Sequence, residues 1–191
     1  MIAATVNIET DYSANLAVIN SWKYAHKFNG LVISPFVKKK IVETARESIL
    51  KNSGTQDETV TFIDKKTGKQ VGEQFQLKYE GGSKAGGTIS VPEADHNSLI
   101  LVHNHGNSSP FSFDDFYLLN KFPEVKAILA VGHNGTVYKM SVGKGKRLDL
   151  SDKMRYNDFE REFHRTYSQK TGDLIALERY CAELGWRFEY A

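Results

Sequence analysis

The sequence predicts an α+β protein in which a mixed β-sheet is flanked by helices. Several short stretches either alternate polar and apolar residues or run entirely apolar, as in Leu99–Val102, and turn residues separate them. Longer stretches repeat apolar residues every three or four positions, as in Val37–Leu50. The 191 residues are 40% hydrophobic and 12% aromatic, so the chain is long and apolar enough to bury a packed core.

The first third of the chain predicts helices. Tyr12–Tyr24 could form one helix, and Phe28-Asn-Gly then breaks the pattern. Val37–Leu50 is a stronger candidate, because Val37, Ile41, Ala45 and Ile49 fall on one stripe. The helix-stopping residues Asn52-Ser-Gly follow it.

The middle of the chain predicts strands. Thr59–Asp64 and Gln70–Lys78 flank the polar turn Lys65-Lys-Thr-Gly68, which favours a hairpin. A loose, glycine-bracketed loop precedes a candidate strand at Thr88–Val91, and the apolar strand Leu99–His103 comes next.

The remainder alternates both kinds of element. Ser112–Asn120 is predicted to be a helix, and His133-Asn-Gly is predicted to turn a hairpin. The hairpin strands are expected at Val125–Val131 and Thr136–Val142. Two amphipathic helices are expected at Asp152–Ser168 and Asp173–Leu184, and a closing strand at Trp186–Tyr190. We expect an N-terminal arm or helix over residues 1–36, a core over 37–145 and a C-terminal helical extension over 146–191, packed on the core.

Composition narrows the function classes. The net charge of +2 argues against a nucleic-acid partner. Basic residues cluster at Lys38–Lys40 and at Lys144, Lys146 and Arg147, and both clusters are interpreted as solvated faces. The lone Cys181 indicates a core thiol and a reducing compartment. Neither a membrane span nor a signal pattern is found, so we expect a cytoplasmic protein with no membrane partner.

The residues that carry chemistry lie at the end of the apolar strand. His103 and His105 are two apart on an extended chain, so their imidazoles are expected on one side while Asn104 points away. Ser112-Phe-Asp-Asp115 follows at short range. Two histidines and one carboxylate, with a fourth position open to water, form the ligand set of a catalytic zinc site. The pattern therefore predicts a metal hydrolase.

His103-Asn-His105 followed by Ser112-x-x-Asp115 resembles the motif of the JAMM (MPN+ or JAB) zinc metallopeptidases, in particular their bacterial, RadC-like branch. The resemblance spans roughly Glu58–Val142. It implies a core like that of the JAMM and cytidine deaminase folds and Zn²⁺ held by His103, His105 and Asp115. It also implies a catalytic glutamate, matched by Glu58, and an oxyanion donor, Ser112. The implied reaction is cleavage of a peptide or isopeptide bond in a protein or peptide substrate.

The sequence leaves two assignments open: the catalytic glutamate and the carboxylate ligand. Glu43, Glu47 and Glu73 compete with Glu58, although the first two are expected on a solvent-facing helix side and the third in a hairpin return. Gly106 stands where the family commonly carries proline, and the gap to Ser112 is one residue shorter than usual. The shorter gap leaves Asp114 as an alternative ligand, although the Ser-x-x-Asp spacing favours Asp115.

Two further interpretations concern context. Many proteins of this fold lack the metal set and serve as scaffolds or interaction domains, which is the alternative to an enzyme. The segment from Ala17 to Gly30 is similar to the lead-in of domains at the C-termini of phage minor head (Mu F-like) proteins, which implies a bacterial or phage-encoded protein. His133 is interpreted as a surface turn residue rather than a fourth ligand, and the sequence leaves the oligomeric state open.

Overall fold

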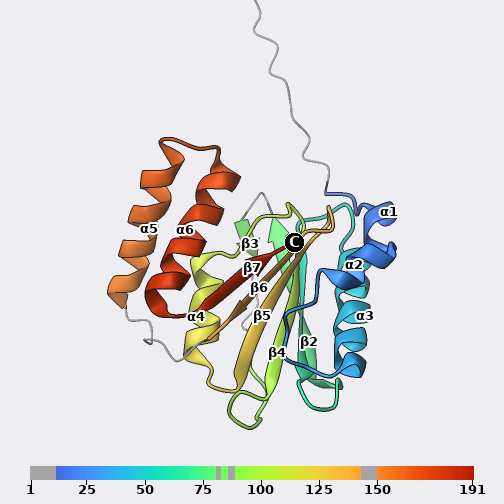
Figure 1. Ribbon diagram of the computed structural model, residues 1–191. Helices are drawn as coiled ribbons and strands as arrows, with labels where there is room; N and C mark the ends of the chain where they lie inside the picture. The colour runs from blue at the N-terminus through green and yellow to red at the C-terminus, as the bar shows by residue number, and fades with distance from the viewer. Residues whose placement is uncertain (1–11, 81–82, 86–88, 143–149) are drawn as a thin grey trace, which may run out of the picture.

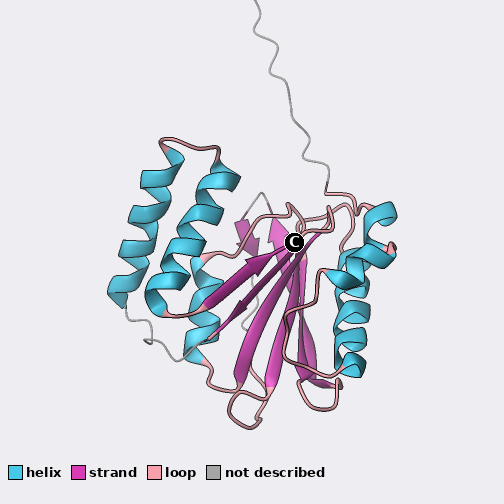
Figure 2. Ribbon diagram, in the orientation of Figure 1, coloured by secondary structure: helices cyan, strands magenta, loops and turns pink. Residues whose placement is uncertain are grey.

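A computed structural model describes residues 12–80, 83–85, 89–142 and 150–191. Within them, one seven-stranded sheet lies between two layers of helices (Figures 1 and 2). The predicted α+β class is confirmed. The second basic cluster, Lys144 to Arg147, lies outside the described residues.

The sheet is mixed. Its strands, in spatial order, are β3 (Ser83–Ala85), β2 (Gln70–Glu80), β1 (Glu58–Asp64), β4 (Leu99–His105), β5 (Val125–Gly132), β6 (Val137–Ser141) and β7 (Arg187–Tyr190). Only β4 and β5 pair in parallel, with Leu101 opposite Ile128. All other neighbours are antiparallel. The central strands β4 and β5 are buried along almost their whole length, as their apolar sequences require.

One face of the sheet is covered by the N-terminal helices. These are α1 (Leu16–Ile19), α2 (Trp22–His26) and α3 (Pro35–Lys51). The predicted stripe of α3, which runs from Val37 to Ile49, packs against the strand residues Ile100, Val102 and Leu129. Two core clusters, one on each face, therefore sandwich the sheet.

The opposite face is covered by α4 (Phe113–Lys121), α5 (Leu150–His164) and α6 (Gln169–Leu184), drawn on the left of Figure 1. An aromatic group made of Phe116, Tyr156, Tyr180 and Trp186 joins these helices. The predicted core position of Cys181 is confirmed, and burial raises the pKa of its thiol to about 12.

Two predicted elements are wrong. The single helix over Tyr12–Tyr24 is broken after Asn20, because the Ser21 hydroxyl accepts the Tyr24 N–H and begins a second helix. The strand expected at Thr88–Val91 is not formed over its described residues 89–91. A short strand, β3, instead forms at Ser83–Ala85, inside the predicted loop, by pairing with the extended end of β2.

Candidate metal centre

Strand β4 delivers both histidines to one face of the sheet. Leu99 and Leu101 belong to the core cluster under α4–α6, and His103 and His105 continue that side of the strand. Ile100 and Val102 belong to the cluster under α3, and Asn104 continues that side. The prediction that the imidazoles share a side while Asn104 points away is confirmed. Both imidazoles are almost fully buried.

The N-terminus of α4 supplies the carboxylate. Ser112 is the N-cap residue, and its N–H donates to Asp115 Oδ2 at 2.7 Å, which is one half of a capping box. The Ser112 hydroxyl donates to the same oxygen at 2.9 Å. Oδ2 is thus held by the helix end, and Oδ1 is directed at His103.

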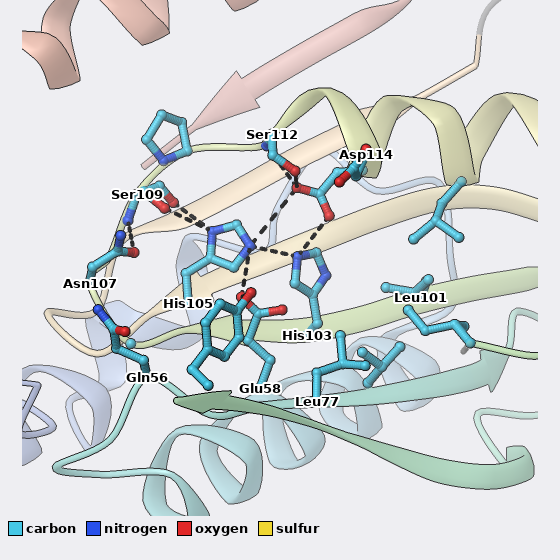
Figure 3. Close-up of a pocket in the computed structure, with 17 residues that line it drawn as sticks. Gln56, Glu58, Leu77, Leu101, His103, His105, Asn107, Ser109, Ser112 and Asp114 are labelled. Carbon is cyan, nitrogen blue, oxygen red and sulfur yellow. Dashed lines mark hydrogen bonds and ion pairs between the residues drawn. The ribbon is translucent and has the colours of Figure 1, made fainter. Parts of the chain in front are cut away.

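Three potential ligand atoms converge in this space (Figure 3). His103 Nε2 lies 2.8 Å from His105 Nε2 and 3.3 Å from Asp115 Oδ1. His103, His105 and Asp115 are the one group of metal-ligating side chains found among the described residues, with ligand atoms within 4.8 Å of one another. In a tetrahedral zinc site with bonds of about 2.1 Å, ligand atoms lie roughly 3.3 Å apart. The set therefore fits a metal ion after small movements: the two imidazoles need to separate by about half an ångström. His105 Nε2, which lies 4.0 Å from Asp115 Oδ2, needs to approach the carboxylate.

The tautomer of His105 also fits a metal ligand. Its Nδ1 lies 2.8 Å from the Ser109 carbonyl oxygen, which can only accept a hydrogen bond. Nδ1 therefore carries the proton, and in the neutral ring the lone pair of Nε2 faces the other two ligand atoms. A backbone carbonyl that accepts the second ring N–H is a common partner of a metal-bound histidine.

The electrostatics of the site favour an ionised Asp115. Burial by itself raises the pKa of this carboxyl, but the adjoining imidazoles and the Ser112 N–H outweigh it and hold the pKa well below its usual range. An anionic ligand is thus present without any change of protonation. Asp114, the alternative ligand, lies in the same cavity but is exposed and outside the ligand group.

Glu58 begins β1 and enters the same cavity. Its Oε1 lies 4.0 Å from His105 Nε2 and accepts a hydrogen bond of 3.0 Å from the Tyr79 hydroxyl. Burial and the Glu58 carboxylate raise the pKa of Tyr79, so the phenol keeps its proton and donates it. The cavity is not lined by any of the competing glutamates of the described chain, which are Glu43, Glu47 and Glu73.

The cavity, of about 360 Å³, has two unlike ends. Leu77 and Leu101 lie on one side of the imidazoles in Figure 3, and Gln56 and Asn107 lie on the other. All five residues that the sequence singled out line this one space: Glu58, His103, His105, Ser112 and Asp115.

The structure gives a reason for glycine at position 106. A Cβ at Gly106 would lie 2.4 Å from the Thr55 carbonyl oxygen, because the loop before β1 crosses the end of β4. Any larger residue would push that loop away. Gly106 therefore allows the segment carrying Glu58 to approach the histidines.

Sequence reasoning missed three polar contacts of the site and misjudged one residue. Tyr79, Ser109 and Asn104 make long-range or loop contacts for which their local patterns give no signal. His133 does lie in the predicted turn, but it is 1% exposed rather than on the surface. Its Nδ1 donates to the Tyr12 carbonyl and its Nε2 accepts from Asn104.

Comparison with known proteins gives no family. No family model matches the chain, and no curated protein or solved structure matches it. Among the described helices, none has the length and apolar character needed to cross a membrane.

Proposed function

We propose that the protein is a zinc-dependent hydrolase that cleaves a peptide or isopeptide bond. The observation that carries the proposal is the convergence of His103, His105 and Asp115 with the carboxylate of Glu58 in one cavity. Imidazole and carboxylate ligands suit Zn²⁺, and three protein ligands leave a position for chemistry.

Each side chain has a distinct task in this proposal. Zinc held by His103, His105 and Asp115 would supply a Lewis acid that lowers the pKa of a water molecule to about 7. Glu58 takes the proton of the attacking water on its carboxylate and later gives it to the leaving amine, which is general acid–base catalysis worth about 10²–10⁴-fold in rate. The Tyr79 hydroxyl donates to Glu58 Oε1, the oxygen that lies 4.0 Å from His105 Nε2, and so orients the carboxylate toward the ligands.

Ser112 is proposed to stabilise the oxyanion of the tetrahedral intermediate. Its hydroxyl hydrogen bonds to Asp115 Oδ2, so it must rotate to donate to the substrate. Rotation leaves Oδ2 with the Ser112 N–H at 2.7 Å, so Asp115 keeps its orientation while the hydroxyl moves.

The substrate class follows from the shape and the lining of the cavity. A cavity of about 360 Å³ accommodates a short stretch of chain rather than a folded domain. Its aliphatic end, lined by Leu77, Leu101 and Leu118, favours an apolar side chain beside the scissile bond. A flexible protein tail or a peptide satisfies both conditions.

The test combines metal analysis with turnover. Protein purified without a nickel column is assayed for bound metal and for cleavage of a fluorogenic peptide library. We expect about one zinc per chain, no zinc in His103→Ala, and full zinc with turnover lowered about 10²–10⁴-fold in Glu58→Gln. Glu73→Gln, an exposed glutamate on β2, is the matched control and should behave as wild type.

Two results would contradict the proposal. Equal zinc content in wild type and His103→Ala would refute the ligand assignment. Zinc-loaded wild type that cleaves no member of the library would refute the peptidase, and the non-catalytic scaffold with a structural metal would then be the better interpretation.

A further inference from the structure

Asn104, the residue between the two histidines, has an unusually complete set of hydrogen bonds. It is fully buried on the α3 side of the sheet, away from the cavity. Its Oδ1 accepts from Ser48 Oγ at 2.7 Å, Asn52 Nδ2 at 2.8 Å and the Thr59 N–H at 2.8 Å. Its Nδ2 donates to the Asp57 carbonyl at 2.9 Å and to His133 Nε2 at 3.2 Å.

The orientation of this amide is fixed by its partners. The Thr59 N–H can only donate and the Asp57 carbonyl can only accept, so exchanging the oxygen and nitrogen of Asn104 would break both bonds. His133 agrees with this orientation. Its Nδ1 must donate to the Tyr12 carbonyl, and burial lowers its pKa, so in the neutral ring Nε2 is an acceptor.

Two of the bonds reach the peptide groups on either side of Glu58. The Asp57 carbonyl belongs to the peptide bond that precedes Glu58, and the Thr59 N–H belongs to the peptide bond that follows it. One side-chain amide therefore restrains both backbone dihedrals of Glu58.

These bonds stand where the main-chain pairing of β1 and β4 stops. The paired residues run from Asp64 and Leu99 to Val60 and His103. One step further along, Thr59 would face Asn104, but Thr59 N–H bonds to the Asn104 side chain instead. The start of β1 is thus held to β4 by a side chain and not by continued main-chain pairing with it.

From this geometry we infer that Asn104 is a positioning residue that sets the place of the Glu58 carboxylate relative to His105. The inference rests on the proposed function, because it assigns Glu58 a role in turnover. The ligands on β4 and the glutamate on β1 belong to different strands, so their separation depends on what joins those strands at this end. Asn104 makes that connection from the same strand that carries both imidazoles, and it touches neither the cavity nor the metal ligands' ring nitrogens.

The experiment replaces Asn104 with a residue too short to span the gap. Asn104→Ser is expected to lower kcat about 10–100-fold, the usual cost of displacing a catalytic group by about an ångström. KM and zinc affinity should change less than about threefold, because the ligand side chains point to the other face. Asn104→Ala is the second variant if the first fails to fold.

Ser48→Ala is the matched control. It removes a donor to the same Asn104 oxygen but leaves both bonds to the peptide groups beside Glu58. We expect it to lower the melting temperature while kcat stays within about twofold of wild type. A structural role for the whole network would instead lower kcat in both variants alike, which would overturn the inference.

A double-mutant cycle separates positioning of Glu58 from every other effect. If Asn104 acts through Glu58, Asn104→Ser should not lower the residual turnover of Glu58→Gln any further. An equal loss in both backgrounds would show that Asn104 acts elsewhere.

A separate readout keeps the inference testable if the protein proves not to be a peptidase. Amide hydrogen exchange at Thr59 reports the bond to Asn104 without any substrate. Exchange at Thr59 should rise at least tenfold in Asn104→Ser and stay unchanged in Ser48→Ala. Unchanged exchange in Asn104→Ser would refute the restraint on the Glu58 backbone, whatever the activity of the wild type.

Discussion

The pair Asp114 and Asp115 offers the sharpest test of the metal centre. The two carboxylates are adjacent in sequence and both line the cavity, but only Asp115 belongs to the ligand group. Asp115→Asn keeps the shape of the side chain and removes its charge, and Asp114→Asn makes the same change one residue away. The difference between the two variants in stability and in zinc binding isolates the contribution of one oxygen ligand.

The loss of stability expected in metal-free Asp115→Asn follows from the two hydrogen bonds that Ser112 donates to Asp115. Each is charge-assisted in wild type and neutral in Asp115→Asn, a difference of about 1 kcal/mol per bond. The variant should therefore lose about 2 kcal/mol of unfolding free energy, which lowers the melting temperature of a chain of this size by roughly 4–8 °C. Asp114→Asn should shift it by less than about 2 °C, because Asp114 is exposed.

The difference in stability between wild type and Asp115→Asn depends on pH. The pKa of Asp115 is lower in the folded protein than its ordinary value of 3.8, so the unfolded chain takes up this proton first as pH falls. The stability that Asp115 contributes is fully present at neutral pH and is lost progressively below about pH 4. Wild type and Asp115→Asn should therefore converge in stability at low pH.

Zinc should increase the difference in melting temperature between Asp115→Asn and the other two proteins, wild type and Asp114→Asn. A hundredfold excess of zinc over its dissociation constant stabilises wild type by about 2.7 kcal/mol, or roughly 5–11 °C. We expect this shift in wild type and Asp114→Asn and not in Asp115→Asn, measured by thermal unfolding with and without zinc. A full zinc shift in Asp115→Asn, or its loss in Asp114→Asn, would refute Asp115 as the carboxylate ligand.

Three other outcomes are expected. Tyr79→Phe removes the hydrogen bond to Glu58 and should lower kcat roughly tenfold with unchanged zinc content, and a kcat equal to wild type would contradict this role. Gly106→Ala should cost about 1–3 kcal/mol in a denaturant titration, because its Cβ meets the Thr55 carbonyl, and an unchanged midpoint would show that the loop yields freely. Zinc affinity measured by calorimetry should fall as pH drops below neutral, since both imidazoles must be deprotonated to bind, and a flat profile would argue against histidine ligands.

Much of the fold could be predicted because local patterns dominate it. The stripe on α3 and the apolar run of β4 each fix the face that is buried, and turn residues mark the ends of the hairpins. The failures lie where local signals are weak. A single serine cap splits the first helix in two, and β3 exists only because the far end of β2 offers it a partner.

The residues of the candidate site could likewise be predicted only where the signal is local. His103, His105 and Asp115 are close in sequence, so strand alternation and the short spacing to Ser112-x-x-Asp115 were enough to predict that they meet. Glu58 could be proposed only from the family resemblance, because its approach to His105 depends on tertiary packing. Asn104 and His133 act through contacts between residues more than 25 positions apart, and no spacing rule reports such contacts.

The buried turn residue His133 ties the beginning of the described chain to this centre. Its ring bridges the Tyr12 carbonyl and the Asn104 amide, and its own carbonyl accepts the Asn15 N–H. Residues 12–15 therefore belong to the same chain of hydrogen bonds that reaches the peptide groups beside Glu58. Moving the Tyr12 carbonyl would remove the acceptor that sets the His133 tautomer, and with it the acceptor of the Asn104 amide, so the two ends of this hydrogen-bonded chain depend on each other.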